Sequence, residues 1–280
     1  MPKGEVSAAI DRLDAAGCLP AAHVWVEESE ACDIQFGRDA SAARGVLEGQ
    51  GYDVVVQLAE GRRKKLIVAD MDSTMITVEC IDELADYAGI KEQVAAVTEA
   101  AMRGELDFGQ ALDARVALLK GMDEAVIDRC LAERVKIMPG AKVLVQTMRG
   151  WGATAILVSG GFTRFAEPVA REIGFNFAIA NVLEIADGKL TGTVRKPIVD
   201  ASTKLATLSE AVLELALETA ETLAVGDGAN DLAMITQAGL GVAYHAKPVV
   251  AAAAGARIDR GDLSALLFAQ GVARKDWVMA

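Results

Sequence analysis

Three short polar motifs contain the residue types that bind phosphate groups and divalent cations. The first is D-M-D-S-T, which runs from Asp70 to Thr74 directly after the apolar stretch L-I-V-A. Carboxylates two residues apart can point at one spot once the chain turns, and they repel each other unless a proton or a cation compensates them. A hard cation such as Mg²⁺ prefers oxygen ligands. A turn or helix cap built from Asp, Ser and Thr is the alternative interpretation.

The second motif is G-D-G-A-N-D, from Gly226 to Asp231. It differs from the dinucleotide-binding pattern G-x-G-x-x-G, because Asp231 stands where a third glycine would allow close helix–strand packing. This difference argues against a nicotinamide enzyme. Asp227 is instead predicted to bind a cation, with Asn230 and Asp231 orienting ligands and bound water around it. A turn followed by a helix cap is the alternative.

The third motif is V-S-G-G-F, from Val158 to Phe162. The hydroxyl group of Ser159 and the approachable backbone at Gly160 suit phosphate oxygens at the start of a helix. The sequence offers no histidine suited to a serine triad, so Ser159 is predicted to bind phosphate rather than to attack it, unless it is an ordinary N-cap. Lys204 lies near the start of a predicted helix, and on its own it is typical of a solvated surface lysine.

Parallel strands are the elements that must position these motifs. Such sheets bind ligands beyond the carboxyl ends of their strands, so Asp70, Ser159 and Asp227 are expected to converge on one crevice. Apolar strands alternating with helices indicate an α/β fold, a parallel sheet with helices on both faces. The predicted strands are 66–70, 154–158, 222–225, 240–244 and 257–259, and the predicted helices between them include 163–173, 202–217 and 231–238.

Two further units are predicted around this sheet. Residues 1–62 have the pattern of a small α/β unit in the order helix, strand, strand, helix, strand, and the basic stretch Arg62–Lys65 is interpreted as a solvated linker. Residues 63–280 form the second domain. Its interval 76–138 is predicted to be a helical insertion above the crevice, because sheet connections are normally short. A hairpin is predicted over 181–194, with its turn at Asp187-Gly188, and hinges near Ile76 and Pro139.

Composition excludes several other classes of protein. The chain has 28 Lys+Arg against 40 Asp+Glu, a net charge of −12 with both histidines neutral, which argues against nucleic-acid binding. Two histidines, and four cysteines without C-x-x-C spacing, argue against a zinc site or a disulfide framework. No signal peptide and no apolar run near the ~18 residues of a membrane span are found. A cytoplasmic protein without a membrane partner is therefore expected.

Taken together, the sequence motifs resemble those of the haloacid dehalogenase-like (HAD) phosphohydrolases over about residues 65–265. These motifs are D-x-D-x-T, a serine, a lysine and G-D-G-x-N-D. The stretches D-M-D-S-T-M-I-T-V-E-C-I-D-E-L and G-E-L-D-F-G-Q-A-L-D-A-R-V-A-L-L-K-G are similar, within that superfamily, to the phosphoserine phosphatase family. The resemblance implies a Rossmann-like HAD fold with a helical-bundle cap and an ACT-like N-terminal domain. It also implies Mg²⁺-dependent hydrolysis of O-phospho-L-serine, the final step of serine biosynthesis. Another small phosphomonoester, or phosphoryl transfer, is the alternative.

The resemblance also implies roles for individual residues. Asp70 would be the nucleophile, and Asp72 the general acid and then the general base. The metal would be held by Asp70, Asp227 and the backbone carbonyl of Asp72. Phosphate would be held by Ser159, Gly160, Lys204 and Asn230, with Asp231 beside them. Substrate would be held by Glu79 at its ammonium group, by Arg115 at its carboxylate, and by the apolar walls Phe108 and Met102.

Two alternatives stay open at this point. Without the resemblance, Arg115 is typical of an exposed charge on an amphipathic helix. An amino-acid-responsive regulator, in which residues 1–62 are the working part, is the alternative outside the enzymes. A homodimer is one assembly that the sequence leaves open.

Overall fold

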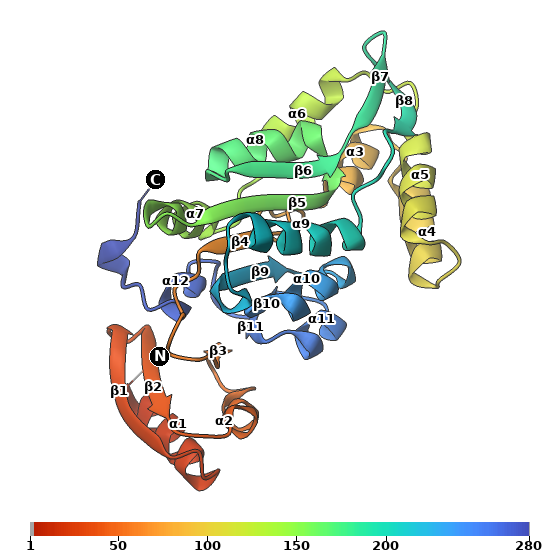
Figure 1. Cartoon of the computed structure of the whole chain (residues 1–280). Coiled ribbons are helices and arrows are strands. Elements are labelled where there is room, and N and C mark those ends of the chain that lie inside the picture. Colours follow the sequence, from red (N-terminus) through yellow and green to blue (C-terminus); the bar gives the residue numbers. More distant parts are fainter. Residues whose placement is uncertain (1–2, 280) are drawn as a thin grey trace.

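The computed structural model describes residues 3–279 and begins with a small N-terminal unit (Figure 1). Its elements follow the predicted order: α1 (Lys3–Ala15), β1 (Pro20–Glu27), β2 (Ala31–Phe36) and α2 (Ala40–Leu47). The antiparallel pair β1–β2 and the two helices enclose an apolar cluster that includes Leu13, Cys18 and Ala43. The ACT-like assignment of this unit stays a prediction.

The last strand predicted for the N-terminal unit instead joins the large sheet. It is reduced to β3 (Val54–Val55), which pairs antiparallel with β11 (Ala256–Ile258). The neighbouring Asp53 explains this pairing, because its carboxylate accepts backbone N–H bonds from residues 259–261 at 2.8–3.3 Å. These bonds hold the segment against the edge of the large sheet.

The interpretation of Arg62–Lys65 as a solvated linker is wrong for Arg62 and Lys64, whereas Arg63 and Lys65 are exposed. The guanidinium group of Arg62 donates to both carboxylate oxygens of Asp33, at 2.5 and 2.9 Å, and to the carbonyl groups of Phe268 and Ala269. Lys64 is only 4% exposed and donates to two backbone carbonyl groups. The stretch therefore fastens the N-terminal unit to the C-terminal end of the chain.

The large sheet has the order β3-β11-β10-β9-β4-β5-β6, and all its pairs are parallel except β11–β3. Its remaining strands are β4 (Leu66–Ala69), β5 (Thr154–Phe162), β6 (Phe177–Asn181), β9 (Thr222–Gly226) and β10 (Leu240–Tyr244). Strand β6 was missed from the sequence. The Rossmann-like parallel sheet is confirmed.

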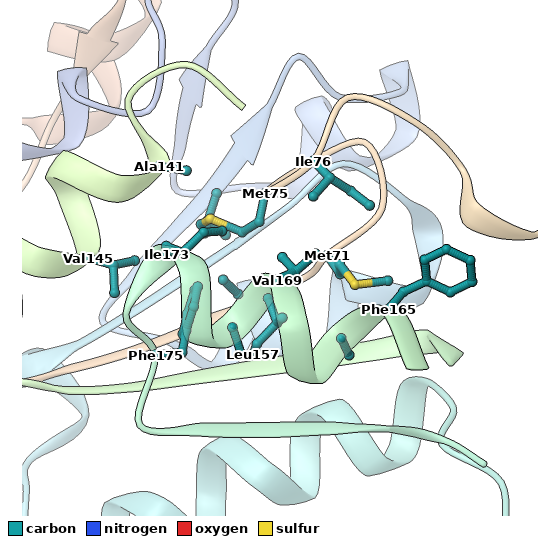
Figure 2. Packing of buried hydrophobic residues seen from close by; sticks show 14 of the residues in the cluster. Met71, Met75, Ile76, Ala141, Val145, Leu157, Phe165, Val169, Ile173 and Phe175 are labelled. Atoms are coloured by element: carbon teal, nitrogen blue, oxygen red, sulfur yellow. The ribbon is translucent and has the colours of Figure 1, made fainter. Parts of the chain in front are cut away.

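Two apolar clusters cover the two faces of this sheet. Side chains alternate between the faces of a strand, and in β4 Ile67 and Ala69 belong to one cluster whereas Leu66 and Val68 belong to the other. Figure 2 shows part of the first cluster, where Phe165 and other side chains of α8 lie over the sheet. The helices that supply these clusters include α7 (Ala141–Gly150), α8 (Thr163–Ile173), α9 (Ala201–Glu214), α10 (Leu232–Gln237), α11 (Pro248–Ala253) and α12 (Ala265–Ala269).

The interval 76–138 is a helical insertion, as predicted, and is called the cap below. It contains α3 (Cys80–Tyr87), α4 (Lys91–Met102), α5 (Phe108–Leu118) and α6 (Ala125–Glu133). An isolated antiparallel bridge between Ile76 and Ile137 joins its two ends. A capping box starts α5, because the Asp107 side chain accepts from the Gln110 N–H and the Gln110 side chain accepts from the Asp107 N–H.

The predicted hairpin is formed by β7 (Leu183–Ala186) and β8 (Lys189–Val194). Its turn residues Asp187 and Gly188 have φ of 51° and 74°, as the favoured two-residue hairpin turns require. Leu190 exchanges backbone hydrogen bonds with the cap, where its carbonyl accepts from Gly121 and its N–H donates to Met122. The hairpin therefore stands beside the cap, away from the large sheet (Figure 1).

The 3₁₀ turns are Thr219–Glu221, Ala229–Asp231 and Arg274–Asp276. Among residues 3–279, no helix combines the length and the apolar composition that a membrane span requires.

Candidate active site

The ends of adjacent strands bring the predicted acids together. Strand β4 lies between β5 and β9, so Asp70 at the end of β4 and Asp227 at the end of β9 meet at one edge of the sheet. One carboxylate oxygen each from Asp70, Asp227 and Asp231 lie within 4.8 Å of one another. The predicted convergence of Asp70 and Asp227 is confirmed, and Asp231 belongs to the same cluster.

Lys204 is buried, although its place in the sequence alone is typical of a solvated surface lysine. Its side chain is 0% exposed, and Nζ lies 2.6 Å from Asp70 Oδ1 and 2.7 Å from Asp231 Oδ1. Burial alone would lower its pKa, but the charges of the two carboxylates outweigh burial and raise the pKa above its ordinary value. Helix α9 positions it, because Asp200 caps the first turn, and the Lys204 N–H donates to the Asp200 carbonyl.

The acidic cluster has the donor set of a divalent-cation site. Burial, together with the charge of Asp70, raises the pKa of Asp227 to about 6. Burial and the same charge also raise the pKa of Asp231, against the opposing effect of Lys204. Three converging carboxylates with one ammonium group leave excess negative charge that a hard, oxygen-seeking cation compensates. Thr74 donates to Asp227 Oδ1 at 3.3 Å and helps to orient it.

Asp72 has an environment that favours its neutral form. The backbone N–H of Cys80, at the start of the cap helix α3, donates to Asp72 Oδ1 at 3.2 Å. Burial first, and then the charges of Glu79 and Asp70, raise the pKa of Asp72 to about 8. Without a cation, this carboxyl group therefore carries a proton at neutral pH, as a general acid must.

The V-S-G-G-F segment forms an irregular end of β5. Its pairing with β6 is interrupted between Val158 and Phe162, and the Gly161 N–H donates to the buried Ser159 Oγ at 2.8 Å. Any side chain at Gly161 would crowd the site, because a Cβ there would lie 2.9 Å from Asp72 Oδ2. The small residues therefore let the phosphate-binding candidates approach Asp72 closely.

The glycines of G-D-G-A-N-D make room for acidic and amide side chains, not for a dinucleotide. A Cβ at Gly226 would lie 2.4 Å from Asp231 Oδ2, and one at Gly228 would lie 2.4 Å from Asn230 Oδ1. The Gly228 N–H also donates to Asp231 Oδ2 at 3.0 Å. The structure thus places Asn230 and Asp231 tightly around the turn that carries Asp227.

Two charged residues of the cap, Glu79 and Arg115, are candidates for substrate binding. Glu79 accepts a hydrogen bond from Ser73 Oγ at 2.8 Å. Arg115 is half-buried on α5, where burial lowers its pKa and the charges of Asp82 and Glu79 oppose that shift.

The predicted apolar walls differ in their placement. Phe108 reaches the sheet, because its Cζ would lie 3.0 Å from a Cβ at Gly160. Met102, at the end of α4, is 78% exposed, so the structure does not place it among the buried residues of the site.

Comparison with known proteins now identifies the family. The model of the haloacid dehalogenase-like hydrolases matches residues 67–236, which include Asp70, Ser159 and Asp227 at their strand ends. This chain belongs to the haloacid dehalogenase-like hydrolase family.

Several relatives of this haloacid dehalogenase-like hydrolase are described as phosphoserine phosphatases. A Streptomyces coelicolor phosphoserine phosphatase is 44% identical over 239 residues, which are 85% of this chain and 58% of that relative. The structure of a probable phosphoserine phosphatase from Vibrio cholerae has a TM-score of 0.76 at 34% identity, over 96% of this chain and 84% of that chain. A structure described as a phospho-aspartyl intermediate analogue of phosphoserine phosphatase has a TM-score of 0.68 at 36% identity, over 73% of this chain and 98% of that chain.

The chain is shorter than several of these relatives. It spans 58% of the Streptomyces coelicolor protein, and 52% and 64% of the phosphoserine phosphatases from Mycobacterium tuberculosis and Haemophilus influenzae.

Sequence reasoning missed two polar residues of this haloacid dehalogenase-like hydrolase. Thr74 lies within the first motif, but its contact with Asp227 crosses from β4 to β9, and no local pattern shows it. Asn181 ends β6, and its side chain donates to the Gly160 carbonyl at 2.8 Å. An asparagine at the end of an apolar strand could have indicated this role. Strand β6 was not recognised from the sequence, so the role of Asn181 was not recognised either.

Proposed function

We propose that this protein hydrolyses O-phospho-L-serine to L-serine and phosphate with the aid of Mg²⁺. The observation that carries the proposal is the contact of Lys204 with Asp70 within the cluster of Asp70, Asp227 and Asp231. The relatives described as phosphoserine phosphatases support the choice of substrate.

The proposed reaction has two displacements. A carboxylate oxygen of Asp70 forms a bond to phosphorus while the bond from phosphorus to the serine oxygen breaks. The Asp72 carboxyl group gives its proton to that oxygen, so serine leaves as an alcohol. Asp72, now a carboxylate, takes a proton from water, and the water oxygen attacks phosphorus to release phosphate and restore Asp70.

Charge compensation is the main task of the surrounding groups. A phosphate monoester repels an anionic nucleophile, and Lys204, Ser159 and the backbone at Gly160 would hold its oxygens where negative charge develops. Asp70 and Asp227, with the backbone carbonyl of Asp72, would hold Mg²⁺, and Asp231 completes the carboxylate cluster beside them. The bound ion would supply Lewis-acid compensation of the phosphate charge.

The cap would select the amino acid. Glu79 offers a carboxylate for the ammonium group of the substrate, and Arg115 offers a fork for bidentate binding of its carboxylate. Phe108, which reaches Gly160, would close the apolar side of the crevice.

A phosphate-release assay tests the proposal. We expect turnover of O-phospho-L-serine with Mg²⁺ and none with EDTA, and no turnover with Mg²⁺ would refute it. Arg115→Ala should lower kcat/KM for O-phospho-L-serine by about 10- to 100-fold, the loss of one charged hydrogen-bonded contact, and leave para-nitrophenyl phosphate unchanged. Arg129→Ala is the matched control on the exposed surface of α6. Equal losses on both substrates would favour the alternative of another phosphomonoester.

Three further statements stay predictions: a cytoplasmic location, the absence of a nucleic-acid partner, and a homodimer.

A further inference from the structure

Asn181 is a buried amide that joins two segments of the candidate site. It is 2% exposed at the end of β6. Its Nδ2 donates to the Gly160 carbonyl at 2.8 Å and to the Val199 carbonyl at 3.2 Å, and its Oδ1 accepts from the Val199 N–H at 2.8 Å. We propose that Asn181 is a positioning residue that sets the distance between the V-S-G-G-F loop and the start of α9.

The first of the two segments lacks regular backbone pairing and needs a side-chain donor. Regular pairing of β5 with β6 stops after Val158 and resumes at Phe162, so the Gly160 carbonyl lies within the interruption. A backbone carbonyl left without a partner in a buried place is costly. Asn181 supplies that partner and thereby fixes the backbone next to Ser159.

The second segment leads directly to Lys204. Val199 precedes Asp200, which caps α9, and the Lys204 N–H donates to the Asp200 carbonyl at 3.1 Å. Both Val199 backbone groups are held by Asn181, so the amide sets where α9 begins. In the proposed function, which this inference assumes, Ser159 and Lys204 hold oxygens of the same phosphate group.

The side chain of asparagine suits this position because it offers donors and an acceptor on one short plane. Aspartate has nearly the same shape, but its carboxylate would face the carbonyl oxygens of Gly160 and Val199 without a proton to donate. Serine would remove the bonds without adding charge. These two substitutions separate the loss of the hydrogen bonds from the effect of a new charge.

Asn176 provides a matched control at the opposite end of the same strand pair. Its Oδ1 accepts from the Ala155 N–H at 2.9 Å, and the residue is exposed. Asn176→Ala therefore removes an amide-to-backbone bond from β5 without touching the segments that carry Ser159 and Lys204.

The test measures phosphate binding separately from stability, on the full chain with Mg²⁺. For Asn181→Asp and Asn181→Ser we expect the inhibition constant of inorganic phosphate to rise, and kcat/KM for O-phospho-L-serine to fall, each by about tenfold, the scale of a lost buried hydrogen bond. Asn176→Ala should change neither by more than about twofold. All assays are run well below each variant's unfolding midpoint.

Each outcome has one meaning. A rise in the phosphate inhibition constant above about fivefold in both Asn181 variants supports the inference. A smaller rise, or failure of both variants to fold, assigns Asn181 a purely structural role and overturns it. An inactive wild-type protein instead overturns the proposed function, and the inference with it.

Discussion

Lys204 is the residue whose removal tests the electrostatics of the site most directly. At an effective dielectric constant of about 20, charges as close as Nζ and each of its two carboxylate partners attract by about 6 kcal/mol. The desolvation of the buried ammonium group offsets much of this attraction. Removal of Lys204 still leaves Asp70 and Asp231 buried against each other, and an orphaned buried charge typically costs about 3–5 kcal/mol.

We therefore expect Lys204→Met to lower the free energy of unfolding by about 3–5 kcal/mol at pH 7. Urea denaturation in EDTA measures this loss without a cation. Lys65→Met is the matched control, because Lys65 Nζ also lies 2.5 Å from a carboxylate oxygen, that of Glu221, but its side chain is 60% exposed. Such a surface pair contributes less than about 1 kcal/mol.

The pH dependence of the free energy of unfolding tests the same electrostatic reasoning. The pKa of Asp231 is already raised by burial, and Lys204 opposes that shift. Without Lys204 the folded-state pKa of Asp231 should rise further, so the folded state binds more protons. The stability of the variant should then recover as the pH falls toward about 4, near the ordinary pKa of Asp. In the wild type, the raised pKa of Lys204 means that its contribution is fully present below pH 10.5 and is lost only at higher pH. A loss within about 1 kcal/mol of the Lys65→Met value, or one that grows at low pH, would refute this reasoning.

Three further predictions concern the same crevice. Gly161→Ala places a Cβ 2.9 Å from Asp72 Oδ2, so kcat/KM should fall at least about tenfold, whereas Gly45→Ala, where a Cβ meets open space on α2, should leave it unchanged. Because the folded-state pKa of Asp72 is raised to about 8, the metal-free protein should lose stability as the pH rises from about 4 to about 8. Asp72→Asn should reduce that slope in urea denaturation, and the raised pKa values of Asp227 and Asp231 account for the slope that stays. Mg²⁺ at 100 times its Kd should stabilise the wild type by about 2.7 kcal/mol in a thermal melt, and Asp227→Asn should abolish most of this gain.

The sheet could be predicted from the sequence because its central strands are short apolar runs buried on both faces. Short apolar runs such as Leu66–Ala69 are typical of buried strands. The helices between them have a clear helical periodicity of apolar residues. Edge strands are harder, because only part of their surface is buried. Phe177 in β6 is 60% exposed, and β3 is only two residues long, so neither gives a strong pattern.

Site residues could be predicted where they belong to a recognisable motif. They could not be predicted where their contacts join segments that are distant in the sequence. Asp70 and Asp227 end recognisable strands, so their convergence follows from the parallel topology. The burial of Lys204 depends on how α9 packs against the sheet, which no local pattern states. Arg62 was interpreted as part of a solvated linker because its partners, Asp33 and the carbonyl groups of 268–269, are distant in sequence.

The bonds between hairpin β7–β8 and the cap have a mechanical consequence. Gly121, Met122 and Glu124 of the cap share backbone hydrogen bonds with Leu190 and Gly188 of the hairpin. Because of these hydrogen bonds, the cap and the hairpin are expected to move together. A cap that opens must then bend the chain at the ends of the hairpin as well as near Ile76 and Pro139. The resistance to cap opening then comes from several segments that are far apart in the sequence. One end of the hairpin, Leu183, follows Asn181 by two residues, so the proposed positioning residue lies next to a segment that would bend.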